Sequence, residues 1–126
     1  MAIGGIKTPW KLARSGIKDH LKPIRSLKHQ AFVKRQHCCV AVALGTAREC
    51  EGPMNFCHYK GFKDSGTGQT GGDERGFPAC WRHHILVQHN IGEAAFQRRY
   101  DIDLKALTLH LARLSPDQRI REKVNG

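Results

Sequence analysis

The segment Pro78–His89, which reads PACWRHHILVQH, is the part of this chain that decides its fold. It holds three of the eight histidines and one of the five cysteines: His83, His84, His89 and Cys80. A thiol and several imidazoles this close together form the ligand set that zinc and similar divalent ions prefer. The other candidate ligands lie upstream: Cys38, Cys39, Cys50, Cys57 and His58. We therefore predict a metal site assembled around Pro78–His89.

Cys80 and His83 are separated by two residues, which is the usual spacing for two ligands of one zinc ion at the start of a helix. Such a pair needs two further ligands from elsewhere. Cys50 and either Cys38 or Cys39 are the available thiols, and together they would complete a Cys₃His site. The alternative is that Cys38 and Cys39 are small buried apolar residues.

The basic charge is concentrated at the N-terminal end. Residues 1–36 hold nine Lys or Arg and one acidic residue, which is +8 of the formal net charge of +10. Lys and Arg clusters of this kind most often bind nucleic acid, whose condensed counterions they release. The alternative is a solvated tail that only aids solubility. We expect residues 1–28 to form a basic, partly disordered arm.

The length of 126 residues suits one domain with a modest core. The N-terminal sequence lacks the pattern of a secretory signal, and no apolar run approaches the ~20 residues of a membrane span. We therefore expect a cytoplasmic protein with no membrane partner. In a reducing cytoplasm, five cysteines indicate metal ligands or free thiols rather than disulfides.

The first half of the chain predicts mixed secondary structure. Ser26 is a plausible N-cap for a helix over residues 27–36. The apolar run 38–44 is typical of a buried strand or of an elbow ahead of one. Residues 50–53 predict a turn, and residues 54–59 predict a second strand with His58 near its end.

The second half is mainly helical. The glycine-rich residues 60–76 predict a long loop that adds nothing to the core. We expect a helix to begin near Trp81 and another to cover residues 93–100. Asp103 can cap an amphipathic helix over residues 104–114, with Leu104, Leu107, Leu111 and Leu114 facing inward. From Asp117 onward the tail is expected to be polar and frayed.

His58, His84 and His89 form a second set of candidate functional residues. One neutral imidazole can take a proton from water, while other imidazoles hold a metal that stabilises the charge developing on a phosphodiester. His58 lies on a different predicted element from the other two, which makes it the natural general base. Taken one at a time, each histidine is more simply explained as an ordinary surface or core residue.

These motifs together resemble the HNH nucleases of the ββα-metal (His-Me) group, and most closely a phage and prophage branch that includes recombination-enhancement nucleases. The resemblance covers roughly residues 28–112 and rests on the following matches: Cys38-Cys39, Gly52-Pro53, His58, the loop from Gly66 to Asp73, Pro78 to His84, Gln88-His89, and Gly92-Glu93-Ala94-Ala95-Phe96. It implies an α+β fold with a small ββα-metal core and additional C-terminal helices. The nuclease domain would cover residues 29–114, and residues 115–126 would form a polar tail.

The resemblance also implies roles for particular residues. His58 would be the general base, on the second strand of the hairpin, and Asp73 would orient it. His84, with His89, would hold a catalytic Mg²⁺, Mn²⁺ or Zn²⁺. The structural Zn²⁺ would be held by Cys39, Cys50, Cys80 and His83. Separately from the resemblance, the concentration of basic charge predicts that DNA is bound by Lys7, Lys11, Arg14, Lys18, Lys22, Arg25, Lys28, Lys34 and Arg35.

The chain departs from the family pattern in three places. Ala41 and Val42 stand where a second entry cysteine is usual, and Cys57 stands where an aspartate often precedes the base. His84 and His89 are five residues apart instead of four, which on a regular helix turns them about 140° away from each other. Either His89 is not a ligand, or a one-residue π-bulge corrects this orientation, and we favour the bulge.

The expected function is that of a metal-dependent DNA endonuclease or nickase, encoded by a phage or prophage and linked to DNA recombination or processing. It would act in the cytoplasm of a bacterial host. DNA is the expected partner, and a recombinase is a candidate second partner. The alternatives are a non-catalytic, zinc-stabilised nucleic-acid-binding protein and, less favoured by the basic arm, a metal-storage or redox-sensing thiol protein.

Overall fold

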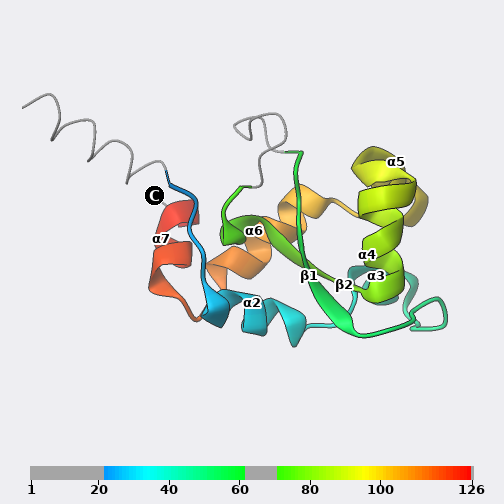
Figure 1. Ribbon diagram of the computed structural model, residues 1–126, viewed down its shortest axis with the longest axis horizontal. Helices are drawn as coiled ribbons and strands as arrows, with labels where there is room; N and C mark the ends of the chain where they lie inside the picture. The colour runs from blue at the N-terminus through cyan, green and yellow to red at the C-terminus, as the bar shows by residue number, and fades with distance from the viewer. Residues whose placement is uncertain (1–21, 62–70, 126) are drawn as a thin grey trace, which may run out of the picture.

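The computed structural model describes residues 22–61 and 71–125, and its elements form an α+β fold (Figure 1). Two helices, α2 (Leu27–Lys34) and α3 (Cys39–Leu44), precede the first strand, β1 (Met54–His58). A short 3₁₀ turn, η1 (Asp73–Arg75), leads into the second strand, β2 (Gly76–Cys80). Four helical segments follow: α4 (Trp81–Ile85) continued by η2 (Leu86–Asn90), then α5 (Gly92–Tyr100), α6 (Leu104–Arg113) and α7 (Gln118–Asn125).

The two strands form one antiparallel sheet, and their register places Cys80 and His58 far apart. Met54 lies opposite Cys80, and His58 lies opposite Gly76. Along a strand, four residues span about 14 Å. His58 and Cys80 therefore lie at opposite ends of the hairpin.

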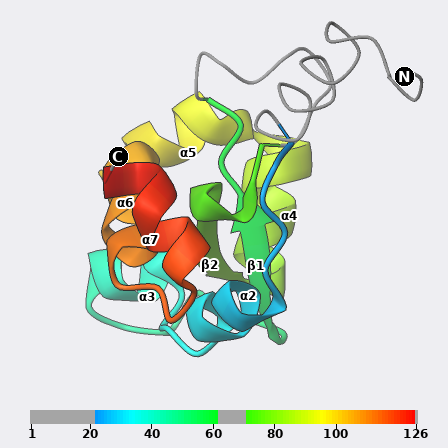
Figure 2. The ribbon, with the colours of Figure 1, turned by 90° about the vertical axis from the view of Figure 1, so that its left-hand side faces the viewer.

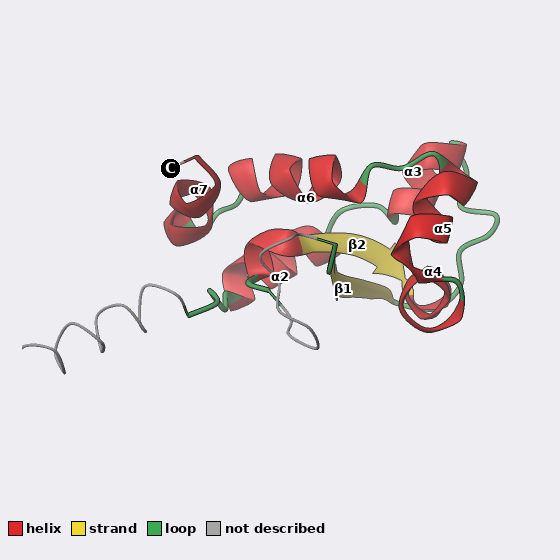
Figure 3. Ribbon diagram, turned by 90° about the horizontal axis from the view of Figure 1, so that it is seen from above, coloured by secondary structure: helices red, strands yellow, loops and turns green. Residues whose placement is uncertain are grey.

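The sheet is enclosed by helices rather than by further strands. Every residue of β2 is buried. Helix α6 runs along the sheet and contacts β2, and α2 contacts both strands (Figure 3). The core between them is formed by buried apolar side chains from most elements, among them Val40, Phe77, Val87, Phe96 and Leu104.

Several predicted helices are confirmed. Ser26 caps α2 by accepting a hydrogen bond from His29 N, and Asp103 caps α6 by accepting one from Ala106 N. Helices α4 and α5 begin within a residue of the predicted positions. Leu114 is an exception among the expected inward positions, because it follows the end of α6 and its side chain is 57 % exposed.

The strand expected over residues 38–44 is wrong, since this run forms helix α3, which ends at Gly45 in the left-handed conformation (φ 71°). A short apolar run has no periodicity that separates a strand from a buried helix, and alanine favours the helix. The hairpin therefore consists of β1 and β2. His58 ends its first strand and not, as expected, its second.

Two parts of the chain that were predicted to lie outside the core are ordered and packed: the C-terminal tail and the end of the glycine-rich region. The tail expected to fray from Asp117 forms α7, which packs against α6 and η1 with Ile120 fully buried (Figure 2). In the glycine-rich region, η1 is buried, and Asp73 N donates to Ile24 O at 2.8 Å. A segment that is polar by composition can pack when its charged groups find partners.

The predicted arm is described only from residue 22 onward, so most of it lies outside the described residues. No helix within the described residues is long and apolar enough to cross a bilayer.

Candidate metal centre and catalytic site

Four side chains converge at the end of the hairpin where β2 runs into α4. Cys80 ends β2, His83 lies one turn into α4, Cys38 directly precedes α3, and Cys50 lies in the loop before β1. Their Sγ and imidazole nitrogen atoms all lie within 4.8 Å of one another. Within residues 22–61 and 71–125, this is the one group of three or more His, Cys, Asp or Glu side chains with the geometry to hold a metal ion.

The distances in this cluster fit a tetrahedral zinc ion. His83 Nδ1 lies 3.1 Å from Cys80 Sγ, 3.6 Å from Cys38 Sγ and 4.0 Å from Cys50 Sγ. Zn–S bonds of about 2.3 Å and Zn–N bonds of about 2.0–2.1 Å at a tetrahedral angle require N···S separations of about 3.6 Å. The three distances bracket that value. The cluster can therefore bind a metal such as zinc.

The charges of the thiols also favour a cation here. A hydrogen bond from the Cys39 thiol lowers the pKa of Cys38 to about 3, which favours its thiolate form. Burial, followed by the nearby Cys38 sulfur, raises the pKa of Cys50 to about 12. A second thiolate beside the first is unfavourable unless a positive ion lies between them, and a bound Zn²⁺ deprotonates its thiol ligands.

Cys38, and not Cys39, belongs to this cluster, which corrects the expected ligand set. Cys38 precedes α3 with a non-helical backbone (φ −54°, ψ 135°), whereas Cys39 is the first residue of the helix. The Cys39 side chain lines a cavity of about 400 Å³ between α3 and α6, together with Val42, Pro78 and Leu111. Its sulfur is therefore not among the four clustered ligand atoms.

Glu49 and Tyr100 lie on the outer side of His83. The Nε2 atom of His83 is 3.7 Å from Glu49 Oε1, which also accepts a 3.0 Å hydrogen bond from the Tyr100 hydroxyl. The Tyr100 ring meets the buried His83 ring edge to face, at 5.7 Å between centroids. Metal-binding histidines commonly donate their second N–H to such a carboxylate, which fixes the ring and its tautomer. The motif in the sequence did not point to Glu49, although its position next to Cys50 was a usable signal.

A second group of polar side chains lies at the opposite end of the hairpin. His58 Nε2 lies 2.9 Å from Asp73 Oδ1, and the ring of Phe56 packs against His58 at 5.0 Å. Asp73 is fully buried, whereas the His58 side chain is 23 % exposed. The pair therefore has a buried carboxylate behind an imidazole that reaches the surface.

Asp73 is ionised because donors surround it. Burial alone would raise the pKa of its carboxyl group, but the hydrogen bonds from His58, Gln30 and the Ser26 backbone outweigh burial and hold this pKa below its usual value. In a neutral imidazole one nitrogen donates and the other accepts. Since an ionised Asp73 can only accept, the proton of neutral His58 lies on Nε2, and Nδ1 carries the free lone pair.

The segment carrying His84 and His89 contains the predicted π-helical turn. Residues 86–90 form η2, a π-helix, and Ile91 N donates to Leu86 O at 2.9 Å. A π turn forms its hydrogen bond between residues five apart, so it adds one residue to the helical turn. Burial first, and then the positive charges of His89 and Lys60, lower the pKa of His84. The π-bulge is confirmed, and the role of His89 as a ligand stays a prediction.

Contacts join this segment to the end of β1. Gln88, between the two histidines, donates from Nε2 to His58 O at 3.2 Å. Glu93 at the start of α5 accepts a 2.7 Å hydrogen bond from Lys60 N. Gln88 and Glu93 belong to the sequence motif, but the motif did not predict which groups they contact. Lys60 lies outside the motif.

Of the basic residues predicted to bind DNA, those in the described part of the chain are all exposed: Lys22, Arg25, Lys28, Lys34 and Arg35. Arg25 Nη1 lies 3.6 Å from Asp73 Oδ1 and donates to Gly71 O at 2.8 Å, so its guanidinium lies beside the His58–Asp73 pair. Lys7, Lys11, Arg14 and Lys18 lie outside the described residues.

Comparison of the chain with known protein families, with curated proteins and with solved structures found no significant match.

Proposed function

We propose that this protein is a metal-dependent DNA endonuclease or nickase that hydrolyses phosphodiester bonds, with His58 as its general base. The observation that carries the proposal is the 2.9 Å contact of His58 Nε2 with the buried, ionised Asp73. This contact leaves a basic Nδ1 on a side chain that reaches the surface. A carboxylate behind an imidazole is the arrangement that orients histidine for proton transfer.

The proposed step exchanges one bond at phosphorus and transfers two protons, and His58 afterwards releases its proton to solvent. His58 Nδ1 takes a proton from a water molecule, whose oxygen forms a bond to the phosphorus as the bond from phosphorus to the leaving oxygen breaks. The leaving oxygen then takes up a proton from solvent. Asp73 stays ionised and stabilises the positive charge that His58 acquires.

His84 and His89 would hold the catalytic ion. When bound, a divalent ion supplies positive charge for the phosphate oxygens and the leaving oxygen. Two imidazoles suit Zn²⁺ best, whereas Mg²⁺ and Mn²⁺ prefer oxygen ligands such as phosphate and water. The order of two strands and a helix, with His58 ending the first strand and His84 on the helix, also supports an HNH-type core.

The positive side chains near this site support a polyanionic substrate. Arg25 lies beside Asp73, and Lys60 lies close enough to His84 to lower the pKa of its imidazole. Both side chains are exposed. Cations in these positions can contact backbone phosphates on either side of the scissile bond without reading sequence. The origin in a phage or prophage, the link to recombination and a recombinase partner stay predictions from the resemblance.

One observation favours the alternative, a zinc-stabilised nucleic-acid-binding protein without catalysis. Within the described residues, His84 and His89 are not joined by a third His, Cys, Asp or Glu ligand, whereas the cluster around His83 is complete. A binder would need the zinc cluster and the basic residues but not His58.

The experiment that separates the two functions combines cleavage with binding. Supercoiled plasmid is incubated with the zinc-loaded protein in Mg²⁺, Mn²⁺ or added Zn²⁺, and in EDTA, while DNA affinity is measured by fluorescence anisotropy. We expect metal-dependent relaxation by the wild type, loss of relaxation in His58→Ala, and equal DNA affinity. His110→Ala, which removes an exposed histidine of α6, is the matched control. Tight DNA binding with no relaxation under any metal would instead support the alternative.

A further inference from the structure

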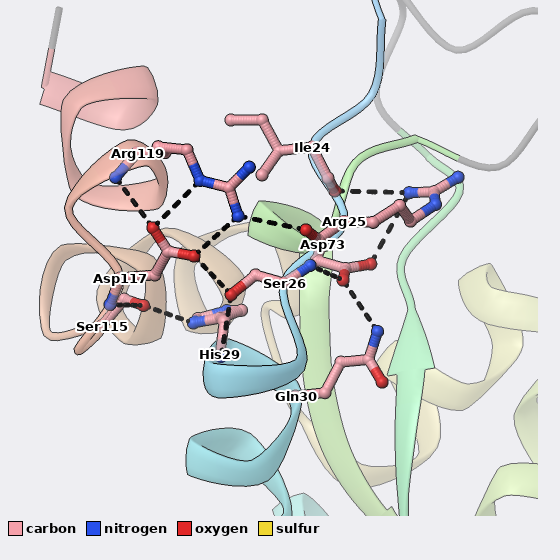
Figure 4. A network of polar contacts seen from close by, with 9 residues as sticks. All are labelled: Ile24, Arg25, Ser26, His29, Gln30, Asp73, Ser115, Asp117 and Arg119. Carbon is pink, nitrogen blue, oxygen red and sulfur yellow. Dashed lines mark hydrogen bonds and ion pairs between the residues drawn. The ribbon is translucent and has the colours of Figure 1, made fainter.

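The structure holds Asp73 with more donors than the contact to His58 requires. Its Oδ1 atom faces His58, and its Oδ2 atom accepts hydrogen bonds from Ser26 N at 2.7 Å and from Gln30 Nε2 at 2.8 Å. Both Oδ2 donors belong to the first turn of α2 or its cap, about 45 residues upstream (Figure 4). The orientation of the carboxylate is therefore set by α2, and not by the strand that carries His58.

We propose that Gln30 is a positioning residue for the candidate base, and that it acts through Asp73 to keep the proton of His58 on Nε2 and the lone pair on Nδ1. This inference rests on the proposed function. Gln30 contacts neither water nor phosphate in this role. Its amide NH₂ fixes the rotation of the Asp73 carboxylate, so that Oδ1 points at the His58 ring.

The direction of the Gln30 amide follows from charge. Asp73 is ionised and accepts only, so the amide must turn its NH₂ group, and not its oxygen, toward Oδ2. Hydrogen bonds to an ionised acceptor are about twice as strong as neutral ones. Without the amide, Oδ2 keeps one donor, Ser26 N, and the rotation of the carboxylate about its Cβ–Cγ bond is fixed less firmly.

Gln30 is itself held in place by a network at the start of α2. Ser26 Oγ accepts from His29 N at 3.0 Å and donates to Asp117 Oδ2 at 2.5 Å. His29 Nδ1 lies 2.7 Å from Ser115 Oγ. Figure 4 shows these groups between α2 and the segment that leads into α7.

The C-terminal segment completes this support. Arg119 Nη2 donates to Asp117 Oδ2 at 3.0 Å and to Arg25 O at 3.1 Å. The C-terminal segment, which is distant in sequence, thus fixes the first turn of α2, and the first turn fixes Asp73. Catalytic groups keep a productive geometry when supporting groups of this kind lock their rotamers.

The test uses the full, zinc-loaded chain and two variants. Gln30→Met keeps the size of the side chain but removes the amide, and Gln30→Asn keeps an amide that is one methylene too short to reach Asp73. Gln36→Met is the matched control, because Gln36 lies just past the end of α2 and donates to Phe32 O at 3.0 Å, away from Asp73. Thermal unfolding of all three checks that they fold.

Two measurements are made on each protein. Two-bond ¹⁵N–¹H correlation spectra report the tautomer of the His58 ring without any need for catalysis, and plasmid cleavage gives kcat and KM. We expect the Nε2–H tautomer to dominate in the wild type and to lose population in both Gln30 variants. We expect kcat to fall by about tenfold or more with KM within about twofold, because a wrongly oriented histidine costs up to about 10⁴ in rate.

Other results would overturn the inference. An unchanged His58 tautomer in both Gln30 variants would show that Gln30 does not act on His58. An equal loss of kcat in Gln36→Met would show that the loss in the Gln30 variants comes from a general loss of stability. A shifted tautomer with unchanged kcat would refute the catalytic role. If the wild type cleaves no DNA, the proposed function fails, while the tautomer measurement still decides whether Gln30 controls His58.

Discussion

Replacing Cys38 or Cys39 by alanine makes the same chemical change at two adjacent buried positions, yet the structure predicts different consequences. Cys38 Sγ lies 3.6 Å from His83 Nδ1, within the cluster that can bind a metal. Cys39 Sγ lies outside that cluster. Only Cys38→Ala should therefore remove a metal ligand.

The expected magnitude follows from linkage. A metal that binds the folded chain stabilises it by RT ln(1 + [M]/Kd), which is about 4 kcal/mol when free metal exceeds Kd about 1,000-fold. If losing one of four ligands raises Kd by about that factor, Cys38→Ala should lose most of this stabilisation. For a domain of this size, 4 kcal/mol corresponds to a fall in Tm of roughly 15 °C. Cys39→Ala should cost about 1–2 kcal/mol, as an ordinary core truncation does.

The assay measures zinc content by mass spectrometry and Tm by circular dichroism at a fixed free zinc concentration. We expect one zinc ion per chain in the wild type and in Cys39→Ala, and far less in Cys38→Ala. Adding EDTA should reduce the difference in Tm between the wild type and Cys38→Ala to the cost of an ordinary core truncation. The assignment fails if Cys39→Ala loses zinc and Cys38→Ala retains it.

Two further predictions concern groups outside the metal cluster. Glu49→Gln should weaken zinc binding by about 10–100-fold in competition with a chromophoric chelator, because the outer carboxylate of His83 is lost; an unchanged affinity would exclude this role for Glu49. Burial lowers the pKa of His29 below its usual 6.5 and outweighs the Asp73 and Asp117 carboxylates, which act to raise it. The His29 imidazole is therefore protonated more readily in the unfolded chain than in the folded one. The stability due to neutral His29 is thus complete above about pH 6.5 and is lost as the pH falls below it. His29→Leu should therefore show a shallower fall of Tm between about pH 7 and pH 5, not an abolished one, since His84 shifts in the same direction; an equally steep fall would contradict this assignment.

Local sequence signals predicted much of the helical structure. Ser26 and Asp103 are side chains whose hydrogen bonds to the next turn begin a helix, and this signal needs no distant partner. The five-residue spacing of His84 and His89 predicted the π turn because a regular helix would separate them. These features depend on residues within one or two turns of each other.

The missed features depend on distant contacts. The apolar run 38–44 would be compatible with a buried strand or with a buried helix. In the structure it forms helix α3, which packs against β2 and α5. The choice between Cys38 and Cys39 required the direction of each side chain, which changes by about 100° for each residue of a helix. Gln30 has no local signal at all, because its partner Asp73 lies 43 residues away.

The ordering of the C-terminal segment had a similar cause. Its polar composition predicted fraying, but Asp117 accepts hydrogen bonds from Ser26 and Arg119, and these lower the pKa of its carboxyl group well below the usual range. Ile120 then fills a fully buried position. A few specific partners were enough to order a segment that composition alone assigns to solvent.

The central claim is that His58 carries out chemistry on a phosphodiester bond, and a single-turnover cleavage rate tests it most directly. Zinc-loaded wild type and His58→Ala, with equal metal content, are mixed in excess with labelled DNA at saturation, and cleavage is followed after Mn²⁺ is added. We predict a rate at least about 100-fold lower for His58→Ala at unchanged DNA affinity, which is the usual contribution of a general base. Equal rates for the two proteins would contradict the assignment of His58 as the base.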